Sequence, residues 1–222
     1  MAVSKLYFIV RLGAECMYKL FAFFDLELID SNTIEKCIAH LPTDRKVKAL
    51  RYHREIDRAT SVVSYLLLVH ALYRHYGLRM PHIAYTRTGK PFLADYPDIH
   101  FNISHCPSGC ICAISDAPVG VDIQDVRPFS IDVVKHCCSQ DELDFLKKSK
   151  NPALDFTRMW AMKESYLKMI GEGICYGLSS VDTINMARKI HTFEYNGCCI
   201  AVASKNFGRD LNEANASSEA NL

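Results

Sequence analysis

The order in which strand-like and helix-like segments follow one another limits the fold of this chain more than any single motif. Short strand-like runs lie on both sides of a long helical stretch over residues 56–76, and the helical runs after residue 130 are followed by further strand-like runs. Strands and helices grouped in this way are typical of α+β folds. We therefore predict two α+β halves, residues 1–116 and 117–204, with a ligand site in the cleft between them.

The first half is expected to open with a strand over Met1–Val10 and to contain one central, largely buried helix. Residues 20–29 are apolar without a clean period, so both a strand and a helix stay open for them. The helix over residues 56–76 should end at Gly77, because glycine accepts the left-handed conformation of a helix terminus. Short strands are predicted to follow over residues 83–86, 99–104, 109–115 and 119–124, with a turn at residues 88–91.

Capping residues divide the second half into helices and strands. Ser130 is the predicted cap of a short helix, Ser139 and Glu142 match a capping box, and Asn151-Pro152 opens a long helix that ends before Gly171. Further strands are expected over residues 181–186, 191–195 and 198–203. The tail, residues 205–222, has little to bury, so it is predicted to be disordered.

Composition narrows the class of protein. Of the 222 residues, 49% are hydrophobic, which is ample for a core, and the net charge of +1 gives no sign of a nucleic acid or a membrane surface as partner. The apolar run at the amino terminus is too short for a signal peptide, and no run approaches the roughly 20 residues that cross a bilayer. We expect a cytoplasmic protein whose anion-binding sites are local.

The ten cysteines raise the question of disulfides or zinc. None of them forms a C-x-x-C pair, and a cytoplasmic protein is kept reduced. Cys106, Cys110 and Cys112 have conceivable ligand spacing, but the last two lie in an apolar run typical of a buried strand. We interpret the cysteines as buried thiols and keep a zinc-bound structural protein as an alternative.

Two short motifs suggest phosphoryl chemistry when they are taken together. In Trp160–Lys168, Glu164 and Lys168 are neighbours on one helix face, and in Gly120–Gln124 the side chains of Asp122 and Gln124 point to one side of a strand. Carboxylate and amide oxygens beside lysines suit Mg²⁺ bound to phosphates. Each motif alone is equally compatible with a solvated strand edge or an exposed ion pair.

Further candidates for phosphate contacts lie in the first half. Ser104 and His105 end a predicted strand and can donate hydrogen bonds to a phosphate, although a turn serine and a partly buried histidine would leave the same pattern. Lys90 lies in a tight turn that aims its ammonium at one point. Residues 45–58 are dense in basic side chains, which could hold an extra phosphate or simply form a solvated helix face.

Four motifs, Gly89-Lys-Pro91, Phe101-Asn-Ile-Ser-His105, Gly120-Val-Asp-Ile-Gln124 and Phe156–Lys168, occur here in an order and spacing that resemble the 4′-phosphopantetheinyl transferases of the surfactin-synthetase-activating (Sfp) type. The resemblance extends over residues 44 to about 186. It implies a monomer of two similar α+β halves related by a pseudo-two-fold axis. It also implies transfer of 4′-phosphopantetheine from coenzyme A to a serine of an acyl, peptidyl or aryl carrier protein, with release of adenosine 3′,5′-bisphosphate.

The resemblance also implies residue roles. Asp122, Gln124 and Glu164 would hold Mg²⁺, Glu164 would be the base for the serine hydroxyl, and Lys168 would neutralise or protonate the leaving phosphate. The residues that would contact coenzyme A are Lys46, Arg58, Lys90, Ser104, His105 and Lys163. Gln124 stands where the family often has glutamate, so it would lower the negative charge at the metal. A non-catalytic binding module with the same fold is the remaining alternative.

Overall fold

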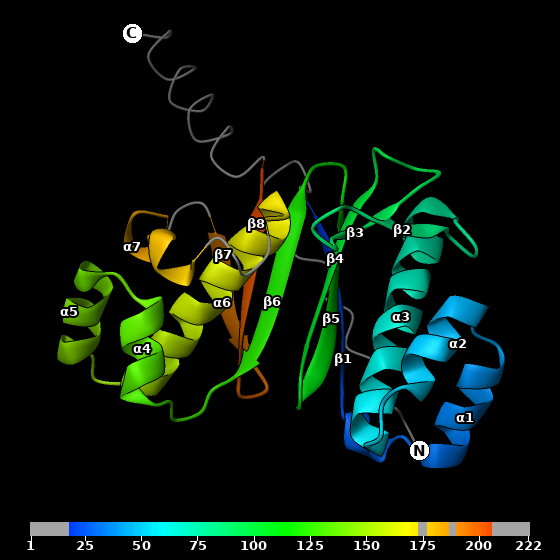
Figure 1. Ribbon diagram of the computed structural model, residues 1–222, viewed down its shortest axis with the longest axis horizontal. Coiled ribbons are helices and arrows are strands. Elements are labelled where there is room, and N and C mark those ends of the chain that lie inside the picture. The colour runs from blue at the N-terminus through cyan, green and yellow to red at the C-terminus, as the bar shows by residue number, and fades with distance from the viewer. Residues whose placement is uncertain (1–17, 173–176, 187–189, 206–222) are drawn as a thin grey trace, which may run out of the picture.

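Antiparallel sheets and the helices that cover them make up the part of the chain that the computed structural model describes, which is residues 18–172, 177–186 and 190–205. The helices and strands are shown in Figure 1. In chain order they are β1 (Lys19–Phe24), a 3-10 helix (Leu26–Leu28), α1 (Ser31–Ala39), α2 (Thr43–Leu50), α3 (Glu55–Tyr76), β2 (Ile83–Tyr85), β3 (Pro91–Leu93), β4 (His100–Cys106), β5 (Gly109–Ser115), β6 (Val119–Asp125), α4 (Ile131–Cys137), α5 (Gln140–Lys148), α6 (Pro152–Ile170), a 3-10 helix (Leu178–Ser180), α7 (Thr183–Met186), β7 (Ile190–Tyr195) and β8 (Cys198–Ser204).

The first sheet has the strand order β1-β5-β4, and a small hairpin of β2 and β3 lies beside it. Every residue of β5 is buried, because the strand is central and both of its faces are covered. On one face Cys110, Cys112 and Ile114 pack against Leu68 and Leu72 of α3. The apolar run with cysteines is therefore a core strand, as the sequence predicts.

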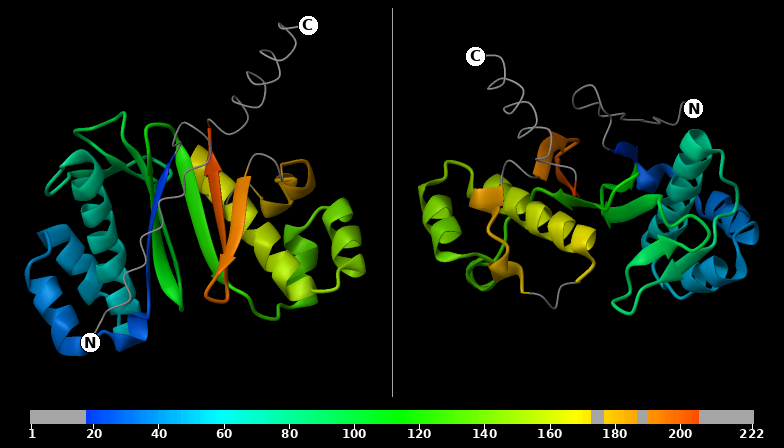
Figure 2. Two further views of the ribbon diagram at one scale, coloured as in Figure 1. Left: turned by 180° about the vertical axis from the view of Figure 1, so that it is seen from behind. Right: turned by 90° about the horizontal axis from the view of Figure 1, so that it is seen from above.

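The second sheet has the strand order β6-β8-β7 and packs against the first. Ile111 of β5, Val121 of β6 and Val202 of β8 meet in the core between the two sheets. Helix α6 covers the opposite face of the second sheet, where Ala161 contacts Ala201. Helix α3, the two sheets and helix α6 thus form four successive layers, which both views in Figure 2 show.

Gly120 allows α6 to lie unusually close to β6. A Cβ atom at this position would stand 2.0 Å from the backbone oxygen of Ser165 and 2.5 Å from the backbone nitrogen of Met169. Real Cβ contacts are never so short, so only glycine is compatible with this packing. The close approach sets the position of the α6 side chains relative to those of β6.

Most of the elements predicted from the sequence are present. Helix α3 ends at Gly77 with a φ of 70°, Ser130 caps α4, and Ser139 and Glu142 form the capping box of α5. The undecided residues 20–29 form β1 and a 3-10 helix. The predicted opening strand over Met1–Val10 and the tail after residue 205 lie outside the described residues.

One predicted strand is wrong. Within residues 181–186, Val181 and Asp182 follow a 3-10 helix, and Thr183–Met186 form the short helix α7. Asp182 causes the difference, because its carboxylate accepts hydrogen bonds from the backbone nitrogens of Ile184 and Asn185 and so starts a helical turn. Among the described helices, none is long and apolar enough to cross a membrane.

Candidate active site

A cavity of about 610 Å³ is lined by residues of strands β4 and β6 and of helices α4 and α6. Strand β4 contributes Ser104 and His105, and β6 contributes Asp122 and Gln124. Helix α6 contributes Glu164 and Lys168 from one face. The structure therefore brings six of the residues predicted from sequence to one cavity. The other lining residues are Ile103, Asp125, Arg127, Pro128, Phe129, Ser130, Val133, Phe156, Thr157 and Trp160.

Asp122 is the centre of the hydrogen-bond network in this cavity, and only 1% of it is exposed. Its Oδ1 accepts hydrogen bonds from Ser104 Oγ at 2.7 Å and from Lys168 Nζ at 2.5 Å. Its Oδ2 accepts a hydrogen bond from Gln124 Nε2 at 2.8 Å. Lys168 also donates to Ser104 Oγ at 3.0 Å. The carboxylate thus orders side chains from β4, β6 and α6.

Glu164 faces the same cavity from α6, but its surroundings differ from those of Asp122. It is 8% exposed, and its carboxylate accepts no hydrogen bond from any side chain or backbone group in the described part of the chain. Burial raises the pKa of Glu164, and the charge of Asp122 acts in the same direction while Lys168 opposes it. A desolvated carboxylate without donors is suited to receive a proton or a cation.

Two further residues, Gly120 and Asn102, fix the positions of β4, β6 and α6 relative to one another. Gly120 allows the close approach of α6, as described above. Asn102 is buried, and its Oδ1 accepts a hydrogen bond from the backbone nitrogen of Val121 at 2.9 Å. This bond links β4 to β6 across the boundary of the two sheets. Asn102 was not among the residues predicted from the sequence, although its spacing of two from Ser104 places both side chains on one face of the strand.

Lys163 does not reach the cavity. Its ammonium is buried and forms an ion pair with Glu142 at 2.8 Å, and it donates hydrogen bonds to the backbone oxygens of Leu178 and Val181 at 2.9 and 2.5 Å. All three donor hydrogens are therefore used inside the protein. This placement does not fit the expected contact of Lys163 with a phosphate, and it makes the residue an anchor between α5, α6 and the segment before α7.

Lys90 is also held by the protein itself. Its Nζ donates a hydrogen bond to the backbone oxygen of Met169 at 2.6 Å, near the carboxyl end of α6. The lysine thus joins the turn between β2 and β3 to α6, and burial lowers its pKa. Lys90 could contact a phosphate only if its hydrogen bond to Met169 were replaced by one to the phosphate.

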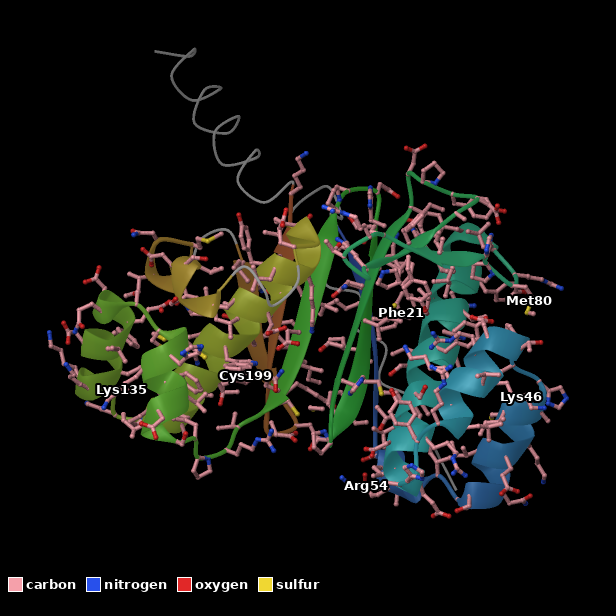
Figure 3. The ribbon with its side chains drawn as sticks, in the orientation of Figure 1. Phe21, Lys46, Arg54, Met80, Lys135 and Cys199 are labelled. Atoms are coloured by element: carbon pink, nitrogen blue, oxygen red, sulfur yellow. The ribbon has the colours of Figure 1, made fainter. Side chains whose placement is uncertain are left out.

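The basic segment presents different side chains from those expected. Lys46 is exposed on α2 and lies on the outer side of the helix in Figure 3. Arg45 and Lys48 instead line a second cavity of about 230 Å³, together with Tyr52. Arg58 lies at a separate cavity beside Leu26 and donates to the backbone oxygen of Tyr52. Within this segment, the rotation of α2 turns Arg45 and Lys48 toward the cavity and leaves Lys46 outside it.

His105 connects these spaces. It lines the cavity of about 610 Å³, the cavity of about 230 Å³ that contains Arg45 and Lys48, and a third cavity of about 300 Å³ beside Tyr52 and Arg54. A polyanionic ligand could therefore extend from the basic end of α2, past His105, to the carboxylates of β6 and α6.

Comparison with known proteins shows the family of the chain. Residues 118–210 match the family model described as the 4′-phosphopantetheinyl transferase superfamily, and residues 30–116 match the model described as 4′-phosphopantetheinyl transferase, N-terminal. The 4′-phosphopantetheinyl transferase psf-1 of Bacillus pumilus is 32% identical over 170 residues, covering 73% of this chain and 72% of the relative. The chain belongs to the 4′-phosphopantetheinyl transferase family.

Other members of this family are similar to the chain at comparable levels. The 4′-phosphopantetheinyl transferase Sfp of Bacillus subtilis (strain 168) is 33% identical over 150 residues, which is 66% of this chain and 67% of the relative. The 4′-phosphopantetheinyl transferase gsp of Aneurinibacillus migulanus is 31% identical over 156 residues, covering 68% of this chain and 65% of the relative. These matches identify the chain as a phosphopantetheinyl transferase of the Sfp type.

The oxygen atoms of this transferase's cavity fit a divalent cation. Asp122 and Glu164 supply carboxylates that face the same cavity, and the Glu164 carboxylate accepts no hydrogen bond from any of the described residues. Gln124 turns its amide nitrogen to Asp122, so its Oε1 is the atom left for a cation or a water molecule. Oxygen ligands of this kind suit Mg²⁺.

Proposed function

We propose that this protein transfers 4′-phosphopantetheine from coenzyme A to a serine of an acyl, peptidyl or aryl carrier protein and releases adenosine 3′,5′-bisphosphate. The observation that carries the proposal is the convergence of Glu164, Asp122 and Lys168 on one cavity. This cavity shares His105 with the neighbouring cavity that Arg45 and Lys48 line. The proposal includes a cytoplasmic monomer with two similar α+β halves, residues 1–116 and 117–204, that enclose the site between them. The lining of the cavity supports this division, because β4 belongs to the first half, whereas β6 and α6 belong to the second half.

Glu164 is the proposed general base. In the reaction the serine oxygen attacks the β-phosphorus of coenzyme A, the bond from this phosphorus to the oxygen bridging to the α-phosphate breaks, and the hydroxyl proton passes to Glu164. The raised pKa that burial gives Glu164 makes its carboxylate a better proton acceptor than an exposed one. No group in the described part of the chain donates a hydrogen bond to Glu164, which leaves its carboxylate available for this transfer.

Lys168 is the proposed partner of the leaving group. Its ammonium lies 2.5 Å from Asp122 and is 28% exposed toward the cavity, so it can exchange that contact for a phosphate oxygen. Negative charge develops on the α-phosphate as the bond breaks, and a lysine next to it stabilises this charge or donates a proton. Asp122 and Ser104 keep the lysine in place before the substrate binds.

Asp122, Gln124 and Glu164 would hold Mg²⁺. When bound, Mg²⁺ supplies a Lewis acid that offsets the charge of the pyrophosphate. The neutral Gln124 adds no charge to this set, so we expect Gln124→Glu to tighten Mg²⁺ binding.

The other end of coenzyme A is proposed to bind at Arg45 and Lys48. Two cations beside a small cavity suit the 3′-phosphate of the adenosine, and His105 lies between them and the carboxylates. This assignment replaces Lys46 and Arg58, which the structure places outside this cavity. Lys90 and Ser104 remain proposed contacts for neighbouring groups, and Lys163 is not included.

A carrier protein is proposed to approach along α4. Arg127, Phe129 and Val133 line the mouth of the cavity next to this helix, and Lys135 lies on the helix itself (Figure 3). Carrier proteins are typically acidic, so these positive charges would steer the serine toward Glu164.

The proposal is tested by measuring the intact mass of an apo carrier protein after incubation with this protein, coenzyme A and Mg²⁺. We expect the mass of one phosphopantetheine to be added, and we expect Glu164→Ala to abolish the addition. Carriers from fatty acid, polyketide and nonribosomal peptide synthesis should be tested in parallel. No addition to any of them, with coenzyme A still bound, would favour a non-catalytic binding module instead.

A further inference from the structure

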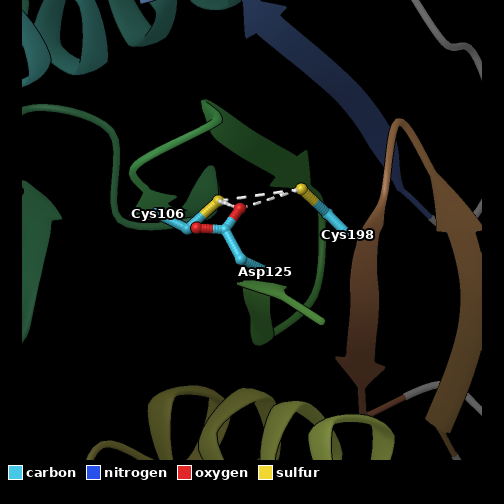
Figure 4. Close-up of side chains that lie close together, drawn as sticks. All are labelled: Cys106, Asp125 and Cys198. Atoms are coloured by element: carbon cyan, nitrogen blue, oxygen red, sulfur yellow. Dashed lines mark hydrogen bonds between the residues drawn. The ribbon is translucent and has the colours of Figure 1, made fainter. Parts of the chain in front are cut away.

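Three potential metal ligands meet at the ends of three strands, outside the proposed catalytic set. Cys106 ends β4, Asp125 ends β6 and Cys198 begins β8, and Figure 4 shows their side chains pointing toward one another. The ligand atoms lie within 4.8 Å of one another. The strands are rigid parts of the two sheets, which hold such atoms more accurately than loops do.

This cluster lies on the opposite side of β6 from Asp122 and Gln124. Side chains alternate along a strand, so residues 121, 123 and 125 point toward the other sheet while residues 122 and 124 point toward α6. Cys106 and Cys198 belong to the core between the sheets and are 6% and 0% exposed. The cluster therefore uses different side chains from those proposed to hold Mg²⁺, although Asp125 borders the same cavity.

The distances match those of a tetrahedral zinc site. Zn–S bonds of about 2.3 Å and a Zn–O bond of about 2.1 Å at tetrahedral angles place two sulfurs about 3.8 Å apart and each sulfur about 3.6 Å from the oxygen. The two Sγ atoms are 3.8 Å apart. Asp125 Oδ1 lies 3.3 Å from Cys106 Sγ and 3.4 Å from Cys198 Sγ. A zinc ion fits with shifts of only a few tenths of an ångström.

The charge balance also favours a cation. Among the contacts of the described residues, Asp125 Oδ1 accepts hydrogen bonds only from the two thiols, which are weak donors. A partly buried carboxylate with such partners is poorly compensated. We propose that Cys106, Asp125 and Cys198 bind one Zn²⁺, with a fourth position open to water. Binding would convert both thiols to thiolates and release two protons.

Two cavities border this cluster. Asp125 lines the cavity of about 610 Å³, and Cys106 lines the cavity of about 300 Å³ next to it. A metal can therefore enter without unfolding, and a water molecule can complete the coordination. Sequence spacing does not reveal this site, because Cys106 is close in sequence to Cys110 and Cys112 but far from Cys198.

The test uses the full-length protein, purified under reducing conditions and freed of metal by a chelator. Co²⁺ is added as a spectroscopic probe and then displaced by Zn²⁺. We expect one equivalent to bind, with the visible bands of tetrahedral Co²⁺ and a near-ultraviolet thiolate band. Zn²⁺ at about 100 times its dissociation constant should raise Tm by roughly 5–10 °C.

Thiol alkylation followed by peptide mass spectrometry locates the ligands without a substitution. Zn²⁺ should protect Cys106 and Cys198 from alkylation, whereas Cys37, which is partly exposed on α1, should react equally with and without the metal. The double variant Cys106→Ser/Cys198→Ser should lose the cobalt bands. Glu164→Ala and Cys37→Ser should keep them, which separates this site from the proposed catalytic one.

Three results would overturn the proposal. The first is the absence of the cobalt bands in the wild-type protein. The second is binding that survives in the double variant, which would place the metal elsewhere. The third concerns reduced protein that is then exposed to air and examined by peptide mapping. A Cys106–Cys198 disulfide that forms as fast with Zn²⁺ as without it would contradict the site, since a bound metal would block this disulfide.

Discussion

Glu164 is the residue whose burial we expect to matter most for activity. It is the proposed base, and it has no hydrogen-bond donor among the described residues. We predict that Glu164→Gln lowers kcat by about 10²–10⁴-fold, because the amide cannot accept the serine proton. Mass spectrometry of the modified carrier protein measures the rate. Glu35→Gln, at an exposed position on α1, is the matched control and should keep the wild-type rate.

The same substitution should not destabilise the protein. Because burial raises the pKa of Glu164 in the folded state, the folded protein holds this proton more tightly than the unfolded chain does. Without added divalent metal, the wild type therefore loses stability as the pH rises from the ordinary glutamate pKa through the raised one. We predict that the Tm of Glu164→Gln exceeds that of the wild type by an amount that grows between mild acid and neutral pH.

Addition of Mg²⁺ should reverse this order. A cation held by Glu164 and Asp122 stabilises the folded wild type and not the variant. Thermal unfolding at neutral pH with increasing Mg²⁺ measures the effect. An equal response of both proteins would show that Glu164 does not bind the metal.

At the scale of elements, the site depends on how closely α6 packs on β6. We predict that Gly120→Ala destabilises the protein by about 1–3 kcal/mol or more, because the added methyl group would contact backbone atoms that cannot rotate away. Activity should fall further than the loss of folded protein explains, since α6 carries Glu164 and Lys168. Chemical denaturation and kcat measured on the folded fraction check both parts. A fully active, stable variant would contradict the close contact.

The buried ion pair between Lys163 and Glu142 anchors α5 to α6. Burial alone would raise the pKa of Glu142, but hydrogen bonds from Lys163, Thr183 and Ser139 lower it below its usual range. We predict that Lys163→Met costs about 3–5 kcal/mol of stability, because it leaves a buried carboxylate unpaired. The double variant Lys163→Met/Glu142→Leu should recover much of this loss. If Lys163→Met instead kept full stability and raised only the KM for coenzyme A, the phosphate contact expected from the sequence would be correct.

These elements show what sequence could and could not predict. Caps, turns and periodicity are local, so α3, α6 and the strands β4, β5 and β6 were predicted nearly to their ends, and the capping box predicted the start of α5. The orientation of one side chain on a helix depends on tertiary packing. For this reason Lys163 was expected at the phosphates although α5 and the segment before α7 cover it. The bond of Asn102 to β6 is likewise visible only once the sheets are placed together.

At the scale of the whole molecule, the motifs lie far apart in sequence and meet because the two sheets pack against each other. The sequence predicted that residues near 104, 122 and 164 share one site, and they line one cavity. It could not predict which basic side chains line the neighbouring cavity, because that depends on how α2 is rotated against α3. Nor could it predict that Cys198 would join Cys106, since their strands belong to different sheets.

If coenzyme A extends from α2 to α6, as proposed, substitutions on α2 should weaken the binding of coenzyme A but not that of an analogue without the 3′-phosphate. We expect Arg45→Ala/Lys48→Ala to raise the KM for coenzyme A by roughly 10–100-fold, because two charge-assisted contacts with the 3′-phosphate are lost. The KM for 3′-dephospho-coenzyme A, which lacks that phosphate, should change by less than about twofold. Lys46→Ala tests the assignment made from the sequence, and Lys36→Ala on α1 is a surface control. If Lys46→Ala alone reproduced the selective loss, α2 would bind the ligand with its outer face. An equal loss with both substrates in the double variant would mean that Arg45 and Lys48 support the fold of this cavity and do not bind the 3′-phosphate.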